Sequence, residues 1–208
     1  MPEILKTKSI YYNDCVLVAQ NPGQVKSRKD IPNELHRIIC APMTSIVGYE
    51  FTKQAAINGI SLCIPRFLNA ESRKGLYHIF RNYRVNDKQL CFMGVGLREL
   101  FNTWEELLQA KCKNWLIDIA HGGIPQLEET IIEIKDKLEI ENLMIGNIMS
   151  GKELRRLSEL RKYCKNLFIR VGVSGGAACS SSDVCGYGRG QITEQIECFN
   201  VKKELFND

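Results

Sequence analysis

The feature that most constrains the fold is a regular alternation of short apolar runs with longer amphipathic segments. Six apolar runs occur, at residues 36–43, 59–65, 89–96, 114–120, 142–147 and 167–173. Each is nearly continuously hydrophobic, as is typical of strands buried on both faces of a parallel sheet. Helical patterns separate or follow them, at residues 48–58, 70–82, 100–112, 125–138, 150–164 and 190–206. The sequence therefore predicts an α/β fold, either an open doubly wound sheet or part of a (β/α)8 barrel.

Charge and composition argue against several classes of partner. The 208 residues carry a net charge of +4, and basic and acidic side chains are interspersed, so no nucleic-acid patch is predicted. No apolar run reaches the roughly 18 residues of a membrane span, and the first residues lack the apolar core of a secretory signal. The nine cysteines are an odd number, lie mostly in apolar runs and lack zinc spacing. We therefore expect a cytoplasmic protein with reduced thiols and neither a nucleic-acid nor a membrane partner.

One loop at the predicted carboxyl ends of the strands stands out, because function in both architectures lies at that edge. The sequence "VSGGAACSSS" places Cys179 after a run of very small residues. Such a loop lets backbone N–H groups converge, which can lower the pKa of a thiol and make it a nucleophile. The alternative interpretation is a surface loop with an incidental cysteine.

Other polar residues of this edge each have a functional and a structural interpretation. Asp118 ends an apolar run, so its carboxylate needs a partner, which is either a ligand or a neighbouring loop. His121 is either a proton carrier or a simple loop residue. The serines at 180–182 either donate hydrogen bonds to an intermediate or cap the loop, and Cys185 is a weaker candidate for a resolving thiol.

Several segments, taken together, resemble the IMP dehydrogenase/GMP reductase family. In the family's order they are "YYNDCVLV…QVKSRKDI", "IICAPMTSIVG", "PRF", "LIDIAHG", "IGNIMSG" and "RVGVSGGAACSSS". The segments "PRF" and "IDIAHG" are more similar to the reductase branch. The chain passes directly from "FRNYRV" towards "CFMGVG", which leaves no room for the regulatory insert domain of most IMP dehydrogenases. The resemblance implies a single barrel domain over residues 1–208.

That barrel is expected to be incomplete. The sequence supplies about six βα units, and strands seven and eight are missing, whereas a typical barrel takes about 250 residues. Three explanations stay open: a truncated sequence, a partner chain that completes the barrel, or a degenerate relative that no longer catalyses. The resemblance also implies a homo-oligomer, usually a tetramer.

The reaction implied by the resemblance is the NADPH-dependent reductive deamination of GMP to IMP and ammonia. Cys179 attacks C2 of the purine and forms a covalent thioimidate, and Ser181 matches a residue implicated in proton transfer. The implied cofactor-binding residues are Ser27, Arg28, Arg66, Asp118, Ile119, Ala120, Val173 and Ser174. The implied substrate-binding residues are Ala41, Met43, Gly172, Gly176 and Ala177. The implied potassium ligands are Ser174, Gly176, Cys179 and Ser182.

The chain departs from the family pattern at three positions of the cysteine loop. Ser174 replaces a usual glycine, Ala177 stands where dehydrogenases often have a phosphate-binding serine, and Ser181 replaces a threonine. Two other functions therefore stay open. One is an IMP dehydrogenase, although Tyr187 and Arg189 are a poor match for its Arg-Tyr flap. The other is a non-catalytic purine-nucleotide-binding or assembly relative.

Overall fold

The computed structural model describes residues 10–15, 34–102, 109–173 and 188–206. One parallel sheet has its six strands in chain order. They are β1 (Ile39–Cys40), β2 (Ser61–Ile64), β3 (Cys91–Val95), β4 (Asn114–Asp118), β5 (Asn142–Ile148) and β6 (Asn166–Val171). The α-helices are α1 (Tyr49–Ile57), α2 (Ala70–Tyr83), α3 (Leu97–Asn102), α5 (Pro125–Ile134), α6 (Gly151–Leu157) and α8 (Gln191–Phe206). Short 3-10 helices are η1 (Tyr12–Asp14), η3 (Leu35–Arg37) and η4 (Ser158–Tyr163).

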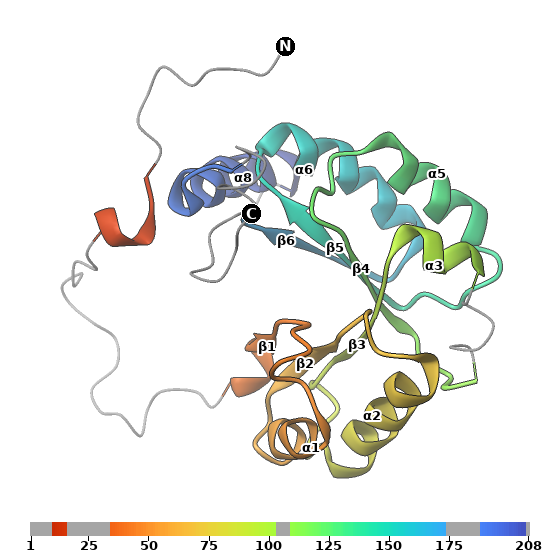
Figure 1. The fold of residues 1–208 in the computed structure, drawn as a ribbon. Helices are drawn as coiled ribbons and strands as arrows, with labels where there is room; N and C mark the ends of the chain where they lie inside the picture. Colours follow the sequence, from red (N-terminus) through yellow and green to blue (C-terminus); the bar gives the residue numbers. More distant parts are fainter. Residues whose placement is uncertain (1–9, 16–33, 103–108, 174–187, 207–208) are drawn as a thin grey trace.

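The sheet curls so that the helices lie around its convex side, as Figure 1 shows. Consecutive strands are neighbours, so every crossover runs in the same sense around the curl. Among the described residues, β1 pairs only with β2 and β6 only with β5, which leaves two sheet edges open. This architecture confirms the prediction of an incomplete (β/α)8 barrel and rules out the doubly wound alternative, in which helices cover both faces.

Two apolar clusters lie on the two faces of the curled sheet. The larger cluster fills the layer between strands and helices and includes Leu62, Trp115 and Ile145. The smaller one lies on the concave face and consists of Cys63, Phe92, Leu116 and Met144, with Ile39, Leu90 and Phe168 packed against it. Across this interior the rings of Phe92 and Phe168 meet edge-to-face with centroids 5.4 Å apart. Burial on both faces explains why the strands are continuously apolar in sequence.

Several helices begin where the sequence supplies a cap. The Asn69 side chain accepts a hydrogen bond from the backbone N–H of Ser72 and so caps α2. Ser150 and Glu153 form a reciprocal capping box at the start of α6, and α5 begins with Pro125. These side chains pair backbone N–H groups that a helix terminus leaves without partners, and proline removes one such group.

Some element boundaries differ from those predicted. The first apolar run, 36–43, contains a strand of only two residues. The helix predicted over 100–112 begins earlier, at Leu97, and residues 109–111 form a turn. The pattern at 125–138 leaves the helix after Ile134, and the pattern at 150–164 becomes 3-10 helix from Ser158 onward. Apolar periodicity continues through these turns because their side chains still face the core.

A ladder of asparagine side chains sets the register at the amino ends of the last three strands. Asn114, Asn142 and Asn166 are aligned across β4, β5 and β6. The Asn142 amide donates to Asn114 Oδ1 at 2.6 Å, and Asn142 Oδ1 accepts from the Asn166 amide at 2.8 Å. Because Asn142 is buried, each lost bond leaves a polar group without water. The ladder therefore resists any slip of one strand past the next.

Within the described part of the chain, no helix combines the length and apolar character needed to cross a bilayer.

Replacing Asn142 with alanine should lower the free energy of unfolding by about 2 kcal/mol, because two hydrogen bonds made by a buried side chain are lost. Urea denaturation followed by circular dichroism measures this change. Asn166→Ala is the matched control, since Asn166 is exposed and makes only the outer bond of the ladder. Equal losses in the two variants would contradict a central role for Asn142.

Candidate functional site

An acid and a base meet on the concave face at the carboxyl end of the sheet. Asp118 on β4, Gly146 on β5 and Arg170 on β6 are aligned in register. Arg170 Nη1 donates to Asp118 Oδ1 at 2.7 Å across the intervening strand. Both side chains are partly buried, so the charge of each is compensated by the other. The partner expected for one oxygen of Asp118 is thus supplied by β6, two strands away in the sheet.

The glycine between the two side chains makes their contact possible. Gly146 has φ of +156°, which L side chains rarely adopt. A Cβ at this position would lie 2.5 Å from the Cβ of Arg170 and 2.8 Å from its carbonyl oxygen. Any larger residue would therefore push Arg170 away from Asp118. The sequence thus places the glycine of β5 between Asp118 and Arg170, where their long side chains must meet.

A second guanidinium faces the other oxygen of the same carboxylate. Arg66 follows β2, and its Nε lies 3.7 Å from Asp118 Oδ2. The Arg66 guanidinium also stacks over the ring of Phe67, 4.0 Å from the ring centroid, and that ring is exposed. Arg66 itself is partly exposed, so the group can still meet a ligand at the rim. The structure thus brings the two predicted cofactor residues Arg66 and Asp118 together.

A cavity of about 250 Å³ lies on the concave face below this charged cluster. Its lining joins the end of β1 to the middle of β6, and comprises Ile39, Cys40, Ala41, Pro42, Cys63, Met144, Phe168, Ile169 and Arg170. The predicted substrate residue Ala41 therefore shares a cavity with Arg170. Met43, two residues further along, is exposed and is absent from this lining.

The predicted residues that end β4 and β6 are held by main-chain hydrogen bonds. The Ile119 N–H donates to the Gly146 carbonyl at 3.0 Å, and the following Ala120 is exposed. The Gly172 N–H donates to the Ile148 carbonyl at 2.9 Å, and the Gly172 carbonyl accepts from the Asn147 amide at 2.5 Å. These strand ends therefore present a fixed backbone rim at the carboxyl edge of the sheet.

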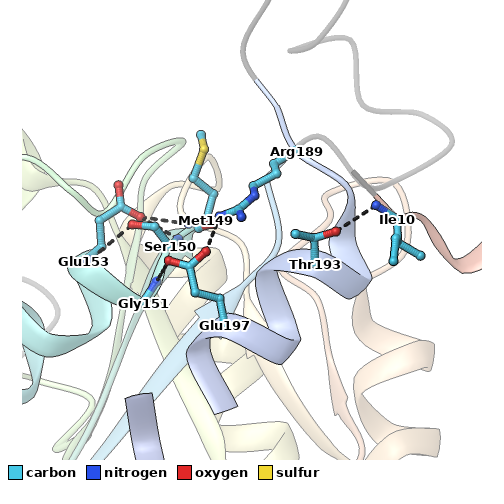
Figure 2. A network of polar contacts seen from close by, with 8 residues as sticks. All are labelled: Ile10, Met149, Ser150, Gly151, Glu153, Arg189, Thr193 and Glu197. Carbon is cyan, nitrogen blue, oxygen red and sulfur yellow. Dashed lines mark hydrogen bonds and ion pairs between the residues drawn. The ribbon is translucent and has the colours of Figure 1, made fainter. Parts of the chain in front are cut away.

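The loops after β4 and β5 are joined by one carboxylate, that of Glu153. Its Oε2 accepts hydrogen bonds from the N–H groups of Met149, at 2.9 Å, and Ser150, at 3.2 Å (Figure 2). Its Oε1 lies 3.3 Å from His121 Nε2. This contact ties His121 to α6, which supports its interpretation as a loop-fixing residue.

Glu194, on the first turn of α8, is a fully buried carboxyl group. Its Oε2 accepts from the Val173 N–H at 3.3 Å, and its Oε1 is buried with no hydrogen-bond partner in the described part of the chain. Burial raises its pKa from 4.5 to about 7, while the Val173 hydrogen bond and Arg189 act in the opposite direction and Glu153 and Glu197 add to the rise. The predicted cofactor residue Val173 is therefore held by an acid that titrates near neutrality.

Many of the predicted site residues lie outside the described residues. They are Ser27, Arg28, Ser174, Gly176, Ala177, Cys179, Ser181 and Ser182, together with Ser180, Cys185 and Tyr187. Val173 is the last described residue before this cysteine segment, defined as residues 174–187, and it ends at the same rim as Asp118 and Arg170. In the described ranges, no group of three or more His, Cys, Asp or Glu side chains could hold a metal ion.

The buried cysteines of the described part have raised thiol pKa values, whereas an activated thiol has a lowered one. Burial raises the pKa of the Cys63 and Cys198 thiols to about 12 and that of Cys112 to about 11. Burial also raises the pKa of the Cys91 thiol well above its usual value. At neutral pH these sulfurs stay protonated, so none of them can serve as a thiolate nucleophile.

Sequence reasoning missed three polar residues of this edge: Arg170, Asn147 and Glu194. Arg170 left a signal, because it interrupts an apolar run just as Asp118 does. Asn147 lies in a Gly-Asn pair that ends a strand, a pattern common to many loops. Glu194 left none, since the helix around it is rich in charged and amide side chains on every face.

Replacing Glu194 with glutamine should change stability in a pH-dependent way. The carboxyl ionises near 4.5 in the unfolded chain but only near 7 in the folded protein, so the wild type loses stability as pH rises through this interval. The neutral amide avoids this penalty, and the variant should be more stable by up to about 3 kcal/mol at about pH 8 and no more stable near pH 4.5. Urea denaturation at the two pH values tests this; an equal difference at both would contradict it.

Comparison with known proteins matches most of the chain to one family. A model of the IMP dehydrogenase / GMP reductase domain matches residues 12–206. A GMP reductase of Streptococcus agalactiae is 24% identical over 180 residues, which cover 86% of this chain and 52% of that protein. A GMP reductase of Lactobacillus acidophilus is 26% identical over an alignment of 223 residues, covering all of this chain and 64% of that protein.

A third relative is similar over a shorter stretch. An inosine-5'-monophosphate dehydrogenase of Borreliella burgdorferi is 34% identical over 97 residues, which cover 47% of this chain and 23% of that protein. The chain thus spans only about half to two thirds of the length of the GMP reductases that it matches. The family match nevertheless extends from η1 into α8 and agrees with the curled parallel sheet. The chain belongs to the IMP dehydrogenase/GMP reductase family.

Proposed function

We propose that the chain carries the catalytic part of a GMP reductase, which converts GMP to IMP and ammonia with NADPH as reductant. The observation that carries this proposal is the position of Val173. It leads directly into the cysteine segment and ends at the rim where Arg66, Asp118 and Arg170 converge. Low but chain-wide identity to two GMP reductases supports the choice of reaction.

In this reaction the Cys179 thiolate forms a bond to C2 of the purine. The exocyclic amine leaves as ammonia after it takes up a proton, for which the Ser181 hydroxyl is the proposed route. NADPH, when bound, supplies the hydride that C2 receives. The carbon–sulfur bond then breaks and returns the thiolate to Cys179, so that GMP, NADPH and two protons give IMP, NADP+ and ammonium. Splitting the reaction in this way separates loss of the amine from reduction.

The residues at the rim fit a dinucleotide cofactor. Arg66 offers a partly exposed guanidinium, and the ring of Phe67 beneath it is exposed to stacking. Asp118 fixes the Arg66 side chain from one side. We propose that Arg66 binds an anionic or carboxamide group of the cofactor, while Ile119, Ala120 and Val173 border it. Ser27, Arg28 and Ser174 are proposed to contribute from outside the described residues.

The concave cavity fits the substrate side of the reaction. Ala41 and Arg170 both line it. Gly172 follows β6 at the rim, where its N–H is hydrogen-bonded to Ile148 and its carbonyl to Asn147. The purine nucleotide is proposed to enter here with Met43 at the exposed mouth, and Gly176 and Ala177 are proposed to contact it. A potassium ion held by Ser174, Gly176, Cys179 and Ser182 remains a proposal from the family resemblance.

The second candidate is an IMP dehydrogenase, which the 34% identity to the Borreliella burgdorferi protein favours over its matched stretch. The two activities separate by substrate, because the dehydrogenase oxidises IMP with NAD+ and the reductase consumes GMP with NADPH. The open edges of β1 and β6 fit a third proposal, in which further strands from a partner chain or homo-oligomer complete the barrel.

Replacing Cys179 with serine should abolish GMP-dependent NADPH oxidation, because the alkoxide needed for the same attack is not formed at neutral pH. The loss of absorbance at 340 nm, with IMP measured by chromatography, follows the reaction. Cys112→Ser is a matched control: its thiol is buried and protonated and lies outside the lining of the substrate cavity, so turnover should survive if the variant folds. Undiminished turnover by the Cys179→Ser protein would contradict the proposal.

Replacing Arg66 with glutamine should raise the KM for NADPH by roughly 10- to 100-fold, the value of one lost charge-assisted hydrogen bond. The KM for GMP should change much less, because the substrate cavity does not include Arg66. Steady-state kinetics with each substrate varied in turn distinguish the two effects. Equal increases in both KM values would argue against a cofactor role.

A further inference from the structure

The cysteine segment is flanked by two anchored residues. At its start, the Val173 N–H donates to the buried carboxylate of Glu194. Beyond its end, Arg189 forms an ion pair with Glu197 one helical turn after Glu194 on α8. Helix α8 thus contacts the chain on both sides of the segment, through two acidic side chains of neighbouring turns (Figure 2 shows Arg189 and Glu197).

Arg189 is also joined to the loop that follows β5. Its Nη1 donates to the Met149 carbonyl at 3.4 Å, and the side chain is only 17% exposed. The partner Glu197 uses its other oxygen to accept from the Gly151 N–H at 2.8 Å, at the start of α6. One carboxylate therefore links Arg189 to α6 as well as to α8. Such a bridging arrangement restricts Arg189 more than a simple surface ion pair would.

The loop after β5, whose Met149 carbonyl accepts a hydrogen bond from Arg189, is itself held by hydrogen bonds. The N–H groups of Met149 and Ser150 are both bound by Glu153, whose other oxygen contacts His121 after β4. The loops after β4 and β5 and Arg189, on one flank of the cysteine segment, therefore belong to one connected set of polar contacts.

A second ion pair between the same two helices offers a natural comparison. Arg155 of α6 pairs with Glu204 near the end of α8. Those side chains are 52% and 61% exposed, and in the described part of the chain neither makes a hydrogen bond or ion pair with a strand-end loop. An exposed pair of this kind contributes little to structure.

We propose that Arg189 and Glu197 are a positioning pair for Cys179: they fix the point at which the chain returns from the cysteine segment, while Glu194 fixes the point at which it leaves. This inference rests on the proposed function only in taking Cys179 as the reactive thiol. Neither residue of the pair needs to touch substrate or cofactor. Their effect is on the geometry in which Cys179 is presented.

The test compares the Glu197→Gln and Arg189→Gln variants of the chain with Glu204→Gln as the control. Iodoacetamide is applied to each folded protein near neutral pH, and peptide mass spectrometry gives the alkylation rate of Cys179 relative to the exposed Cys15 of the same chain. We expect this ratio to fall about three- to tenfold in both variants, as for the loss of a charge-assisted hydrogen bond. It should stay at the wild-type value in Glu204→Gln and recover most of the way in Arg189→Lys, which keeps the charge.

The outcomes separate this inference from the proposed function. If the ratio in Glu197→Gln and Arg189→Gln equals that in Glu204→Gln, or rises, the positioning role is wrong, whatever the turnover. If the wild type shows no GMP-dependent NADPH oxidation but the ratio falls as expected, the positioning role stands and the proposed reaction does not. Arg189→Gln leaves the Gly151 contact of Glu197 in place, so it still answers the question if Glu197→Gln fails to fold.

Where turnover is present, kcat and KM give a second readout. A positioning role predicts a lower kcat with KM for GMP and NADPH nearly unchanged, since the pair lies outside the proposed binding residues. A rise in both KM values at constant kcat would overturn it.

Discussion

The contact between Asp118 and Arg170 across Gly146 is the interaction on which the site depends. It requires three parallel strands in one register, a missing side chain on the middle strand, and the same face of all three turned inward. At the opposite ends of these strands, the asparagine ladder holds the same register. A slip of one residue would turn Asp118 or Arg170 toward the helix layer and leave a buried charge without its partner.

Apolar side chains fill the layer between strands and helices, whereas charged side chains gather at the carboxyl edge of the sheet, where Asp118 and Arg170 meet. The layer between strands and helices is apolar, and its thiols are held protonated by burial. The carboxyl edge instead carries the fully buried Glu194 and the partly buried Asp118 and Glu153, and burial raises the pKa of Glu194, which costs stability at neutral pH. Such costs are typical of sites where geometry is retained for function. The described residues of the rim therefore hold in place the chain that leads into the cysteine segment, through contacts such as Val173–Glu194.

The sequence was a good guide to the sheet because its strands are buried on both faces, which produces the uninterrupted apolar runs. It was a poorer guide to where strands and helices begin and end. The run at 36–43 contains a strand of only two residues, and the helix predicted at 100–112 begins at Leu97. Asp118 was predicted from its place at the end of an apolar run and Arg66 from the family resemblance, but the contact between the two side chains was not predicted. Arg170 and the asparagine ladder depend on pairings between strands far apart in the chain, which no local pattern specifies.

The central claim is that Cys179 attacks the purine of GMP, and intact mass spectrometry of the protein after incubation with GMP alone tests it most directly. The account predicts a covalent adduct with the mass of GMP less ammonia, located by peptide mapping on the segment that contains Cys179. Addition of NADPH should discharge the adduct as IMP. A folded chain that binds GMP but forms no adduct, or forms it on another residue, would contradict the account.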